Sequence, residues 1–223
     1  MSKIMFSKID LEGVKGVLID IDNTLYAYEP VHQIAIKACY NLFVKEITGK
    51  TSLFFEQFYN KYRQKRKDVT ERLKPQSACR SRLFAFQAMF EEMNLKHAFN
   101  QALEFEGLYW NTLIKNMQLC EGAEKFLKEC EEKEIKICAV SDMQAHFQIQ
   151  KLQALKVNHL IDYLVTSEEV GAEKPAGIMF ETALKKLQLN PEEVIMVGDN
   201  EEKDIQGATV LGIKSFLVEF VDD

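Results

Sequence analysis

An apolar run that ends in two aspartates constrains the fold of this chain most strongly. Residues 16–19 (Gly-Val-Leu-Ile) are followed by Asp20, Ile21 and Asp22. Such a run is typical of a buried parallel strand, and open α/β sheets bind their ligands at the carboxyl ends of their strands. Two carboxylates at such a position require a compensating cation, for which Mg²⁺ is the natural candidate, and a carboxylate is also a nucleophile toward phosphorus. The alternative interpretation is a strand followed by an acidic turn that Asp22 or Asn23 stabilises.

Composition excludes several classes of protein. The 223 residues allow one or two domains, and the net charge of -6 argues against generic nucleic-acid binding. No stretch approaches the length of a membrane-spanning helix, and residues 1–6 contain no apolar run long enough for a signal peptide. The five cysteines are odd in number and include no Cys-x-x-Cys pair, which argues against a zinc site or a disulfide framework. We therefore expect a protein of the reducing cytoplasm, without membrane or nucleic-acid partners.

The pattern becomes helical after the first strand. Apolar residues recur at helical spacing in four stripes, which predict four helices between about residues 31 and 115. The stripes are Val31, Ile34, Ala35, Ala38, Leu42 and Phe43; Phe54, Phe55, Phe58, Tyr59 and Tyr62; Leu83, Phe84, Phe86, Met89, Phe90 and Met93; and Phe99, Ala102, Leu103, Leu108, Tyr109 and Leu113. We expect a helical domain over residues 28–116, inserted into a core domain formed by residues 1–27 and 117–223.

The remainder of the chain alternates between helical and strand patterns. Helices are predicted at 123–133, 147–155, 178–187 and 205–211, and strands at 135–140, 161–165, 194–197 and 213–218. Strands that alternate with helices favour right-handed crossovers and a parallel sheet. The predicted fold class is therefore α/β, a Rossmann-like parallel sheet with helices on both faces, plus the inserted helical bundle.

Three further polar sites stand where strands end or helices begin. Ser141 follows a predicted strand, and its hydroxyl can donate to an anionic oxygen or cap the next helix. Lys174 precedes Pro175 at a predicted helix start, where the ammonium would neutralise an anion or lie in solvent. Asp199 follows a third strand and Gly198, with Asp204 five residues later; these acids also suit an ordinary helix N-terminus.

These sites should converge, because the carboxyl ends of parallel strands lie along one edge of a sheet. Asp20, Ser141 and Asp199 each follow a predicted strand, and Lys174 lies between the last two in the sequence. Acids, a cation and a hydroxyl are therefore expected in a single crevice.

The order of these motifs resembles the haloacid dehalogenase superfamily. The pattern is Asp-x-Asp-x-Thr, then strand-Ser, then Lys-Pro, then Gly-Asp-x-x-x-x-Asp. It is similar to the phosphatase branch in which a helical cap is inserted after the first motif, and the resemblance covers nearly the whole chain. Residues 22–26 (Asp-Asn-Thr-Leu-Tyr) are similar to the nucleotidase and sugar-phosphate phosphatase relatives.

The resemblance implies a Mg²⁺-dependent phosphatase that forms an aspartyl-phosphate. Asp20 would attack the phosphoryl group, and Asp22 would protonate the leaving oxygen and then activate water. Mg²⁺ would be held by Asp20, the backbone carbonyl of Asp22, and Asp199. Asp204 would not bind the metal directly but would mainly orient water or Lys174.

The resemblance also implies how the phosphate is bound. Ser141 and Lys174 would bind the phosphoryl oxygens, aided by the backbone N–H groups that follow Asp20 and by Asn23, and Thr24 would shape the turn. The chain departs from the family pattern at Asp142, a carboxylate that should point away from the phosphate or meet a cation, and at Gly177, which loosens the sequence after Lys174-Pro175.

The substrate implied is a small phosphomonoester of the nucleotide or sugar-phosphate class, and the chain would act as a monomer or a homodimer. Alternatives are a phosphomutase or phosphotransferase on the same core, a 2-haloacid dehalogenase, and a non-catalytic ligand-binding relative. Asp22 and Asp199 disfavour dehalogenation, which needs no Mg²⁺. The basic run 61–67 either contacts an anionic substrate or forms a solvated helix face, Trp110 is expected in the core, and Tyr26 and Tyr28 could stack on a base or a sugar.

Overall fold

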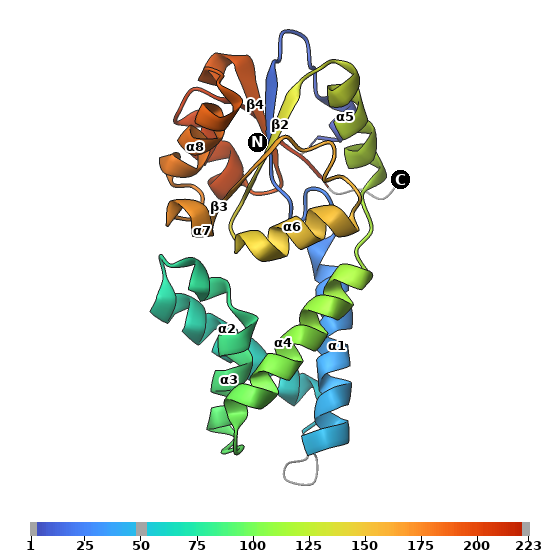
Figure 1. Ribbon diagram of the computed structural model, residues 1–223, viewed down its shortest axis with the longest axis vertical. Helices are drawn as coiled ribbons and strands as arrows, with labels where there is room; N and C mark the ends of the chain where they lie inside the picture. The colour runs from blue at the N-terminus through green and yellow to red at the C-terminus, as the bar shows by residue number, and fades with distance from the viewer. Residues whose placement is uncertain (1–3, 48–52, 220–223) are drawn as a thin grey trace. The chain divides into compact units, whose positions relative to one another are not determined.

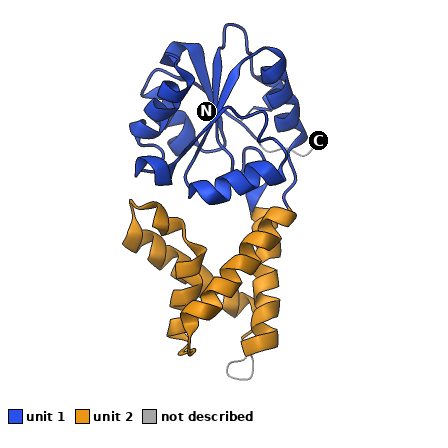
Figure 2. Cartoon of the chain, in the orientation of Figure 1, with its two compact units in different colours: residues 1–28, 117–223 blue, residues 29–116 orange. Residues whose placement is uncertain are grey.

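The computed structural model describes residues 4–47 and 53–219, which form two compact units (Figure 2). The first unit comprises residues 1–28 and 117–223, and the second comprises residues 29–116. The second unit is thus an insertion in the first. No helix in the described ranges is long and apolar enough to cross a membrane.

The first unit is built on a five-stranded parallel sheet. Its strands are β1 (Gly16–Ile19), β2 (Lys136–Ser141), β3 (Tyr163–Thr166), β4 (Val194–Gly198) and β5 (Lys214–Leu217). Their order across the sheet is β3-β2-β1-β4-β5, and every neighbouring pair is parallel. All four residues of β1 are buried, as expected for a central strand with both faces covered. The predicted α/β fold class is confirmed.

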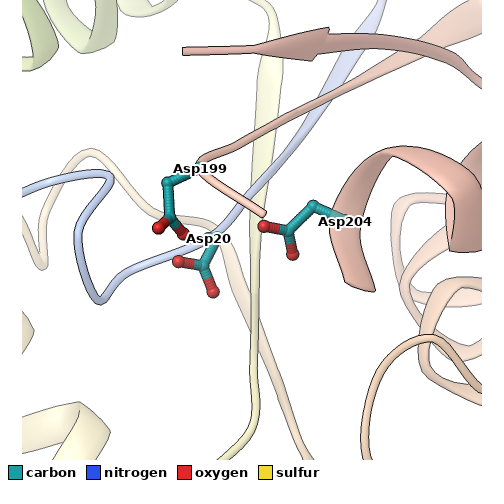
Figure 3. A group of neighbouring side chains, drawn as sticks. All are labelled: Asp20, Asp199 and Asp204. Carbon is teal, nitrogen blue, oxygen red and sulfur yellow. The ribbon is translucent and has the colours of Figure 1, made fainter. Parts of the chain in front are cut away.

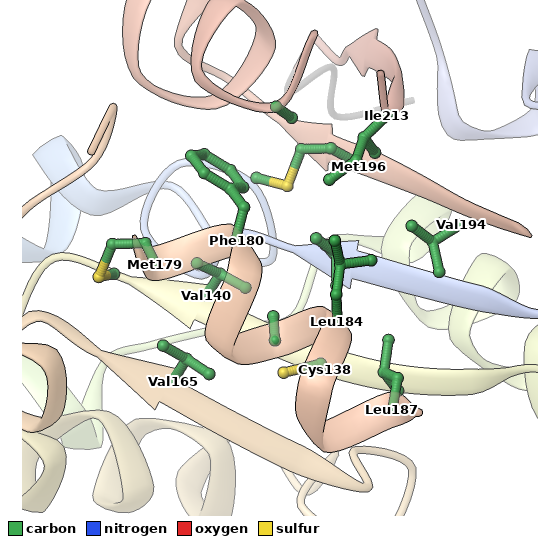
Figure 4. Packing of buried hydrophobic residues seen from close by; sticks show 13 residues of the cluster. Cys138, Val140, Val165, Met179, Phe180, Leu184, Leu187, Val194, Met196 and Ile213 are labelled. Carbon is green, nitrogen blue, oxygen red and sulfur yellow. The ribbon is translucent and has the colours of Figure 1, made fainter. Parts of the chain in front are cut away.

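Helices connect the strands and cover both faces of the sheet. They are α5 (Glu121–Glu132), α6 (Ala145–Ala154), α7 (Ser167–Val170), α8 (Gly177–Leu187) and α9 (Gly207–Thr209), with the short 3₁₀-helices η1 (Phe6–Lys8) and η3 (Pro191–Glu193) and the π-helix η4 (Glu201–Gln206). Helices α8 and α5 lie on opposite sides of the sheet (Figure 1). One face is sealed by a cluster in which Phe180 and Met179 of α8 pack on β-strand residues such as Val140 and Met196 (Figure 4). Each large side chain buried in this way contributes roughly 1.5–3 kcal/mol.

Two local predictions for this unit were wrong, and one short helix was not predicted. The segment predicted as a helix at 205–211 instead begins at Glu201 as the π-helix η4 and continues as α9 only to Thr209; the short helix that was not predicted is α7. Pro175 does not open the next helix: it follows a cis peptide bond with Lys174, and α8 begins at Gly177. The loop that carries Lys174 therefore ends before the helix starts.

All the secondary-structure elements among the described residues of the second unit are helices. Its elements are α1 (Tyr28–Ile47), which starts at the last residue of the first unit, α2 (Phe55–Leu73), η2 (Ser77–Arg80), α3 (Arg82–Glu92) and α4 (Ala98–Lys115). Its core is aromatic, with Phe86 4.8 Å from Tyr62 and Phe90 4.8 Å from Phe105 between ring centroids. Trp110 is buried, as the sequence indicated.

Five residues predicted to line these helical cores are instead exposed, namely Ile34, Phe54, Phe84, Phe99 and Leu103. In α4 the buried positions include Ala102, Phe105, Tyr109 and Leu113, which follow one another at intervals of three and four. Leu103 comes one residue after Ala102, so it lies about 100° around the helix from the buried face. The predicted stripes were therefore too wide.

Candidate functional site

Asp20 is placed by the central strand of the sheet. It directly follows β1, and its backbone N–H donates to the Val197 carbonyl of β4 at 3.0 Å, which extends the strand pairing by one residue. Its side chain is buried, and its Oδ2 accepts a hydrogen bond from the Thr24 hydroxyl at 3.2 Å. The sheet thus holds this carboxylate at its carboxyl edge in a fixed orientation.

Lys174 is buried against two carboxylates. Its Nζ lies 2.5 Å from Asp20 Oδ1 and 2.6 Å from Asp204 Oδ1, and it also donates to the Val140 carbonyl at 2.9 Å. Burial lowers the pKa of the Lys174 ammonium, but the neighbouring carboxylates outweigh burial and raise that pKa above its usual value. Lys174 is therefore a fixed cation and not a solvated loop residue.

Three carboxylates converge beside this lysine. Asp20, Asp199 and Asp204 each offer one oxygen, and these oxygens lie within 4.8 Å of one another (Figure 3). Asp20 follows β1, Asp199 follows β4, and Asp204 belongs to η4. A cluster of oxygen donors around one point suits Mg²⁺. The cluster includes Asp204, which the sequence analysis had not counted among the direct metal ligands.

The crowding of acids shifts the titration of Asp20. Burial raises the pKa of its carboxyl, the nearby Asp204 and Asp22 raise that pKa further, and Lys174 opposes them. The site therefore holds more negative charge than its lysine balances, and a bound cation would offset the excess.

The residues after Asp20 form a tight turn. Asn23 has a φ of 64°, its N–H donates to the Tyr26 carbonyl at 3.0 Å, and its Oδ1 accepts from the Tyr28 N–H at 3.0 Å. Asparagine tolerates this left-handed conformation better than most residues. Asn23 and Thr24 therefore shape the turn, and a phosphate contact by Asn23 stays a prediction.

Ser141 ends β2 beside Asp20 and is buried. Its hydroxyl accepts a short hydrogen bond from Gln148 Nε2 of α6. That bond leaves the hydroxyl hydrogen available as a donor toward an anionic oxygen.

Asp142 meets a cation, which is one of the two outcomes expected for it. Lys203 Nζ lies 2.6 Å from its Oδ2, and the backbone N–H of Lys174 donates to its Oδ1 at 2.7 Å. The carboxylate is therefore compensated locally, and it also fixes the backbone at Lys174.

The Asp22 carboxylate is held by a second group of side chains. Lys151 Nζ lies 2.6 Å from its Oδ1, Gln148 Nε2 lies 3.1 Å from its Oδ2, and the Tyr26 hydroxyl donates to its Oδ1. Burial raises the pKa of Asp22, but these three partners outweigh it, so the pKa lies below its ordinary value. Tyr26 is fully buried in this network, which excludes the stacking role considered for it.

The sequence reasoning missed Lys151 and Gln148. Both belong to α6 and both are buried, Lys151 at 1% exposure and Gln148 at 0%. The available signal was their spacing: two polar residues three apart share a helix face with Leu152 and Leu155. A polar pair on an apolar face indicates a buried partner, although spacing alone cannot identify Asp22.

The fold and the site together define a class. A parallel sheet that presents a buried carboxylate, a fixed lysine and further acids at its carboxyl edge is the architecture of an α/β hydrolytic enzyme that works from the ends of its strands. The sequence model of the haloacid dehalogenase-like hydrolases matches residues 14–212, and the chain belongs to this family.

Individual relatives agree with this assignment. A ribulose-1,5-bisphosphate 5-phosphatase of Halopiger xanaduensis is 32% identical over 91% of this chain and 83% of its own. A glyceraldehyde 3-phosphate phosphatase of Methanothermobacter thermautotrophicus is 30% identical over 92% of this chain and 85% of its own. The chain is a phosphoric monoester hydrolase, as the sequence predicted.

The fold also matches a solved structure. The 2-haloacid dehalogenase of Pseudomonas syringae pv. Tomato superposes with a TM-score of 0.72 over 91% of this chain and 85% of its own, at 20% identity. This likeness concerns the fold only.

Proposed function

We propose that this protein is a Mg²⁺-dependent phosphatase of small sugar phosphates that works through an aspartyl-phosphate on Asp20. The observation that carries the proposal is the position of Asp20, at the end of the central strand with Lys174 Nζ 2.5 Å from one oxygen and the acids Asp199 and Asp204 beside it. The substrate class rests on the two relatives named above, which are phosphatases of sugar phosphates by their names.

The reaction consists of two displacements at phosphorus. Asp22 enters the reaction protonated, having taken a proton from solvent, to which 29% of its side chain is exposed. In the first displacement, an Asp20 oxygen bonds to phosphorus, the bond to the leaving oxygen breaks, and Asp22 gives that oxygen its proton. In the second, Asp22 removes a proton from water, the water oxygen bonds to phosphorus, and the bond to Asp20 breaks. The products are the alcohol and inorganic phosphate, and both aspartates return to their starting states.

The remaining polar residues stabilise the charge that develops. Lys174 holds Asp20 in line and places its ammonium near the phosphoryl oxygens, and the Ser141 hydroxyl donates to one of them. Asp20, Asp199, Asp204 and the backbone carbonyl of Asp22 would hold Mg²⁺. The bound ion would neutralise negative charge on the phosphoryl group. We assign the helical unit, residues 29–116, the role of a cap that shields the site from water.

A direct experiment compares the wild-type protein with Asp20→Asn on p-nitrophenyl phosphate, with Mg²⁺ and with EDTA. We expect Mg²⁺-dependent release of phosphate by the wild type only. Equal rates for the two proteins would refute the phosphatase mechanism.

A substrate panel then tests the class of substrate. The panel contains glyceraldehyde 3-phosphate, ribulose 1,5-bisphosphate, nucleoside monophosphates and phosphoserine, with 2-chloropropionate as the haloacid control. The highest kcat/KM is expected for a sugar phosphate. Metal-independent release of chloride would instead identify a dehalogenase, and a preference for nucleotides would leave the mechanism intact but change the substrate class.

A further inference from the structure

Asp22 lies in a network that joins it to one helix. Lys151 Nζ is 2.6 Å from Asp22 Oδ1, Gln148 Nε2 is 3.1 Å from Asp22 Oδ2, and Tyr26 donates to the same carboxylate. Lys151 Nζ also lies 5.7 Å from the centre of the Tyr26 ring. Both Asp22 carboxylate oxygens therefore accept hydrogen bonds from side chains, which fixes the rotation of the carboxylate as well as its position.

Maintaining this network is costly for the fold. A buried lysine loses the hydration of its ammonium, and a buried ion pair is often no more stable than an apolar pair of the same volume. The side chain of Lys151 is 1% exposed, whereas that of Asp22 is 29% exposed. The lysine is thus hidden while the aspartate keeps a face open to solvent, and this asymmetry suits a group that must still reach a reacting molecule.

The amide of Gln148 supports the same interpretation. Its Nε2 donates to both Asp22 and Ser141, while its Oε1 is buried with no hydrogen-bond partner among the described residues. Buried polar atoms are rarely left unpaired. The amide therefore gives up one hydrogen bond and directs its N–H group toward two residues of the site.

We propose that Lys151 is a positioning residue for Asp22: with Gln148 it holds the carboxylate in the orientation from which Asp22 exchanges protons with the leaving oxygen and with water. The inference rests on the proposed function. Lys151 Nζ pairs with Asp22 and lies near the Tyr26 ring, and we assign it no contact with the phosphoryl group, so its effect on turnover passes through Asp22. Substrate binding depends on Lys174 and Ser141 and should change little when Lys151 is altered.

The choice of substrate separates this role from general damage to the site. The p-nitrophenolate ion leaves without a proton, whereas the alkoxide of glyceraldehyde 3-phosphate needs one. In Lys151→Met we expect kcat for glyceraldehyde 3-phosphate to fall about 100-fold with KM within about threefold. The initial burst of p-nitrophenolate, which reports attack by Asp20, should slow by less than about tenfold.

A double-mutant cycle with Asp22→Asn supplies the second readout. If Lys151 acts through Asp22, adding Lys151→Met to Asp22→Asn should change the burst rate by less than about twofold. The double variant removes both charges together, so it also avoids an unpaired buried carboxylate and should fold even if the single variant does not. A further loss of about tenfold or more in the double variant would overturn the proposal.

Lys186→Met is the matched control. Lys186 also pairs with a carboxylate of the same unit, 2.7 Å from Glu169 Oε1, and it donates to the Leu164 carbonyl at 2.6 Å. It should keep wild-type rates on both substrates. The positioning role is refuted if the wild type is active and Lys151→Met has the same rates as Lys186→Met. It is also refuted if Lys151→Met loses rate equally on glyceraldehyde 3-phosphate and on p-nitrophenyl phosphate. A wild type no more active than Asp20→Asn would instead remove the proposed function, and this inference with it.

Discussion

Gly198 lies directly against the Asp204 side chain. A Cβ at Gly198 would be 2.4 Å from Asp204 Oδ2 and 2.5 Å from its Cγ, closer than side-chain atoms approach one another. The Asp204 carboxylate also accepts the Asn200 N–H at 3.0 Å and the Lys174 ammonium at 2.6 Å. Because Gly198 has no side chain, the Asp204 carboxylate can lie where it contacts and orients Lys174.

Gly198→Ala should displace Asp204 and loosen Lys174 with it. We expect a loss of roughly 10- to 100-fold in kcat/KM on p-nitrophenyl phosphate, because small errors in position are costly in catalysis. The overpacked site should also lower the free energy of unfolding by about 1–3 kcal/mol, measurable by urea denaturation. Wild-type turnover in this variant would show that Asp204 does not need its observed position.

Gly107→Ala is the matched glycine control. Gly107 lies within α4, and a Cβ there would meet no atom within 4 Å. The change should leave activity unaltered and raise the free energy of unfolding by roughly 0.5–1 kcal/mol, because alanine restricts the unfolded chain and favours helix.

Mg²⁺ should stabilise the folded protein through its acidic cluster. An ion that binds only the native state adds about 2.7 kcal/mol at one hundred times its Kd, and thermal denaturation would record this as a rise in Tm. Asp199→Asn should abolish the rise. Asp22→Asn should keep it, since only the backbone carbonyl of Asp22 is assigned to the metal. Loss of the rise in Asp22→Asn would require the roles of the two aspartates to be reassigned.

Asp10→Asn serves as the control for this titration. Asp10 is exposed, and its Oδ1 accepts the Glu12 N–H at 2.9 Å. Its replacement removes one surface charge from the first unit without touching the acidic cluster, so the Mg²⁺-dependent rise in Tm should be that of the wild type.

The strand ends could be predicted from the sequence because they depend on a simple rule. Asp20, Ser141 and Asp199 each follow a β-branched or apolar run, and parallel strands bring such positions to one edge. The ion pair between Asp142 and Lys203 was only half foreseen. Repulsion from a phosphate predicted that Asp142 would either point away or meet a cation, but no local pattern could identify Lys203, which is 61 residues away.

The contacts of α6 could not be predicted, because they depend on how the helix is rotated over the sheet edge. The same limit explains the exposed Ile34 and Leu103 in the helical unit. A stripe of apolar residues predicts a helix, but its buried face is fixed only when neighbouring helices pack. The loop at Lys174 departs from the predicted helix start for a similar reason, because Asp142, in the bend after β2, fixes its backbone.

Lys203→Met should expose the phosphate site to the charge of Asp142. The KM for p-nitrophenyl phosphate should rise about two- to fivefold, the effect of a solvent-screened charge contact of about 0.5–1 kcal/mol, while kcat changes less. Lys15→Met removes the exposed pair with Glu193 and is the control. An unchanged KM in Lys203→Met would mean that Asp142 does not influence the bound phosphate.

His32 should make the stability of the helical unit depend on pH. Burial lowers its pKa to about 4, and Arg82, Arg66 and Arg63 act in the same direction. In the unfolded chain His32 takes up a proton near pH 6.5, whereas in the folded protein it does so only near pH 4. The contribution of neutral His32 to the stability of the folded state is therefore fully present above pH 6.5. This contribution, about 3 kcal/mol at most, is lost as the pH falls from 6.5 to 4.

The single tryptophan, Trp110, is buried beside Tyr109, whose hydroxyl lies 2.8 Å from His32 Nδ1, so its fluorescence should follow unfolding of this unit. The free energy of unfolding in urea, measured from pH 7 to pH 4, should fall more steeply for the wild type than for His32→Gln, which cannot take up the proton. The difference between the two proteins isolates His32 from the carboxylates that titrate in the same range. Parallel curves for the two proteins would show that His32 is protonated in the folded state as readily as in the unfolded chain.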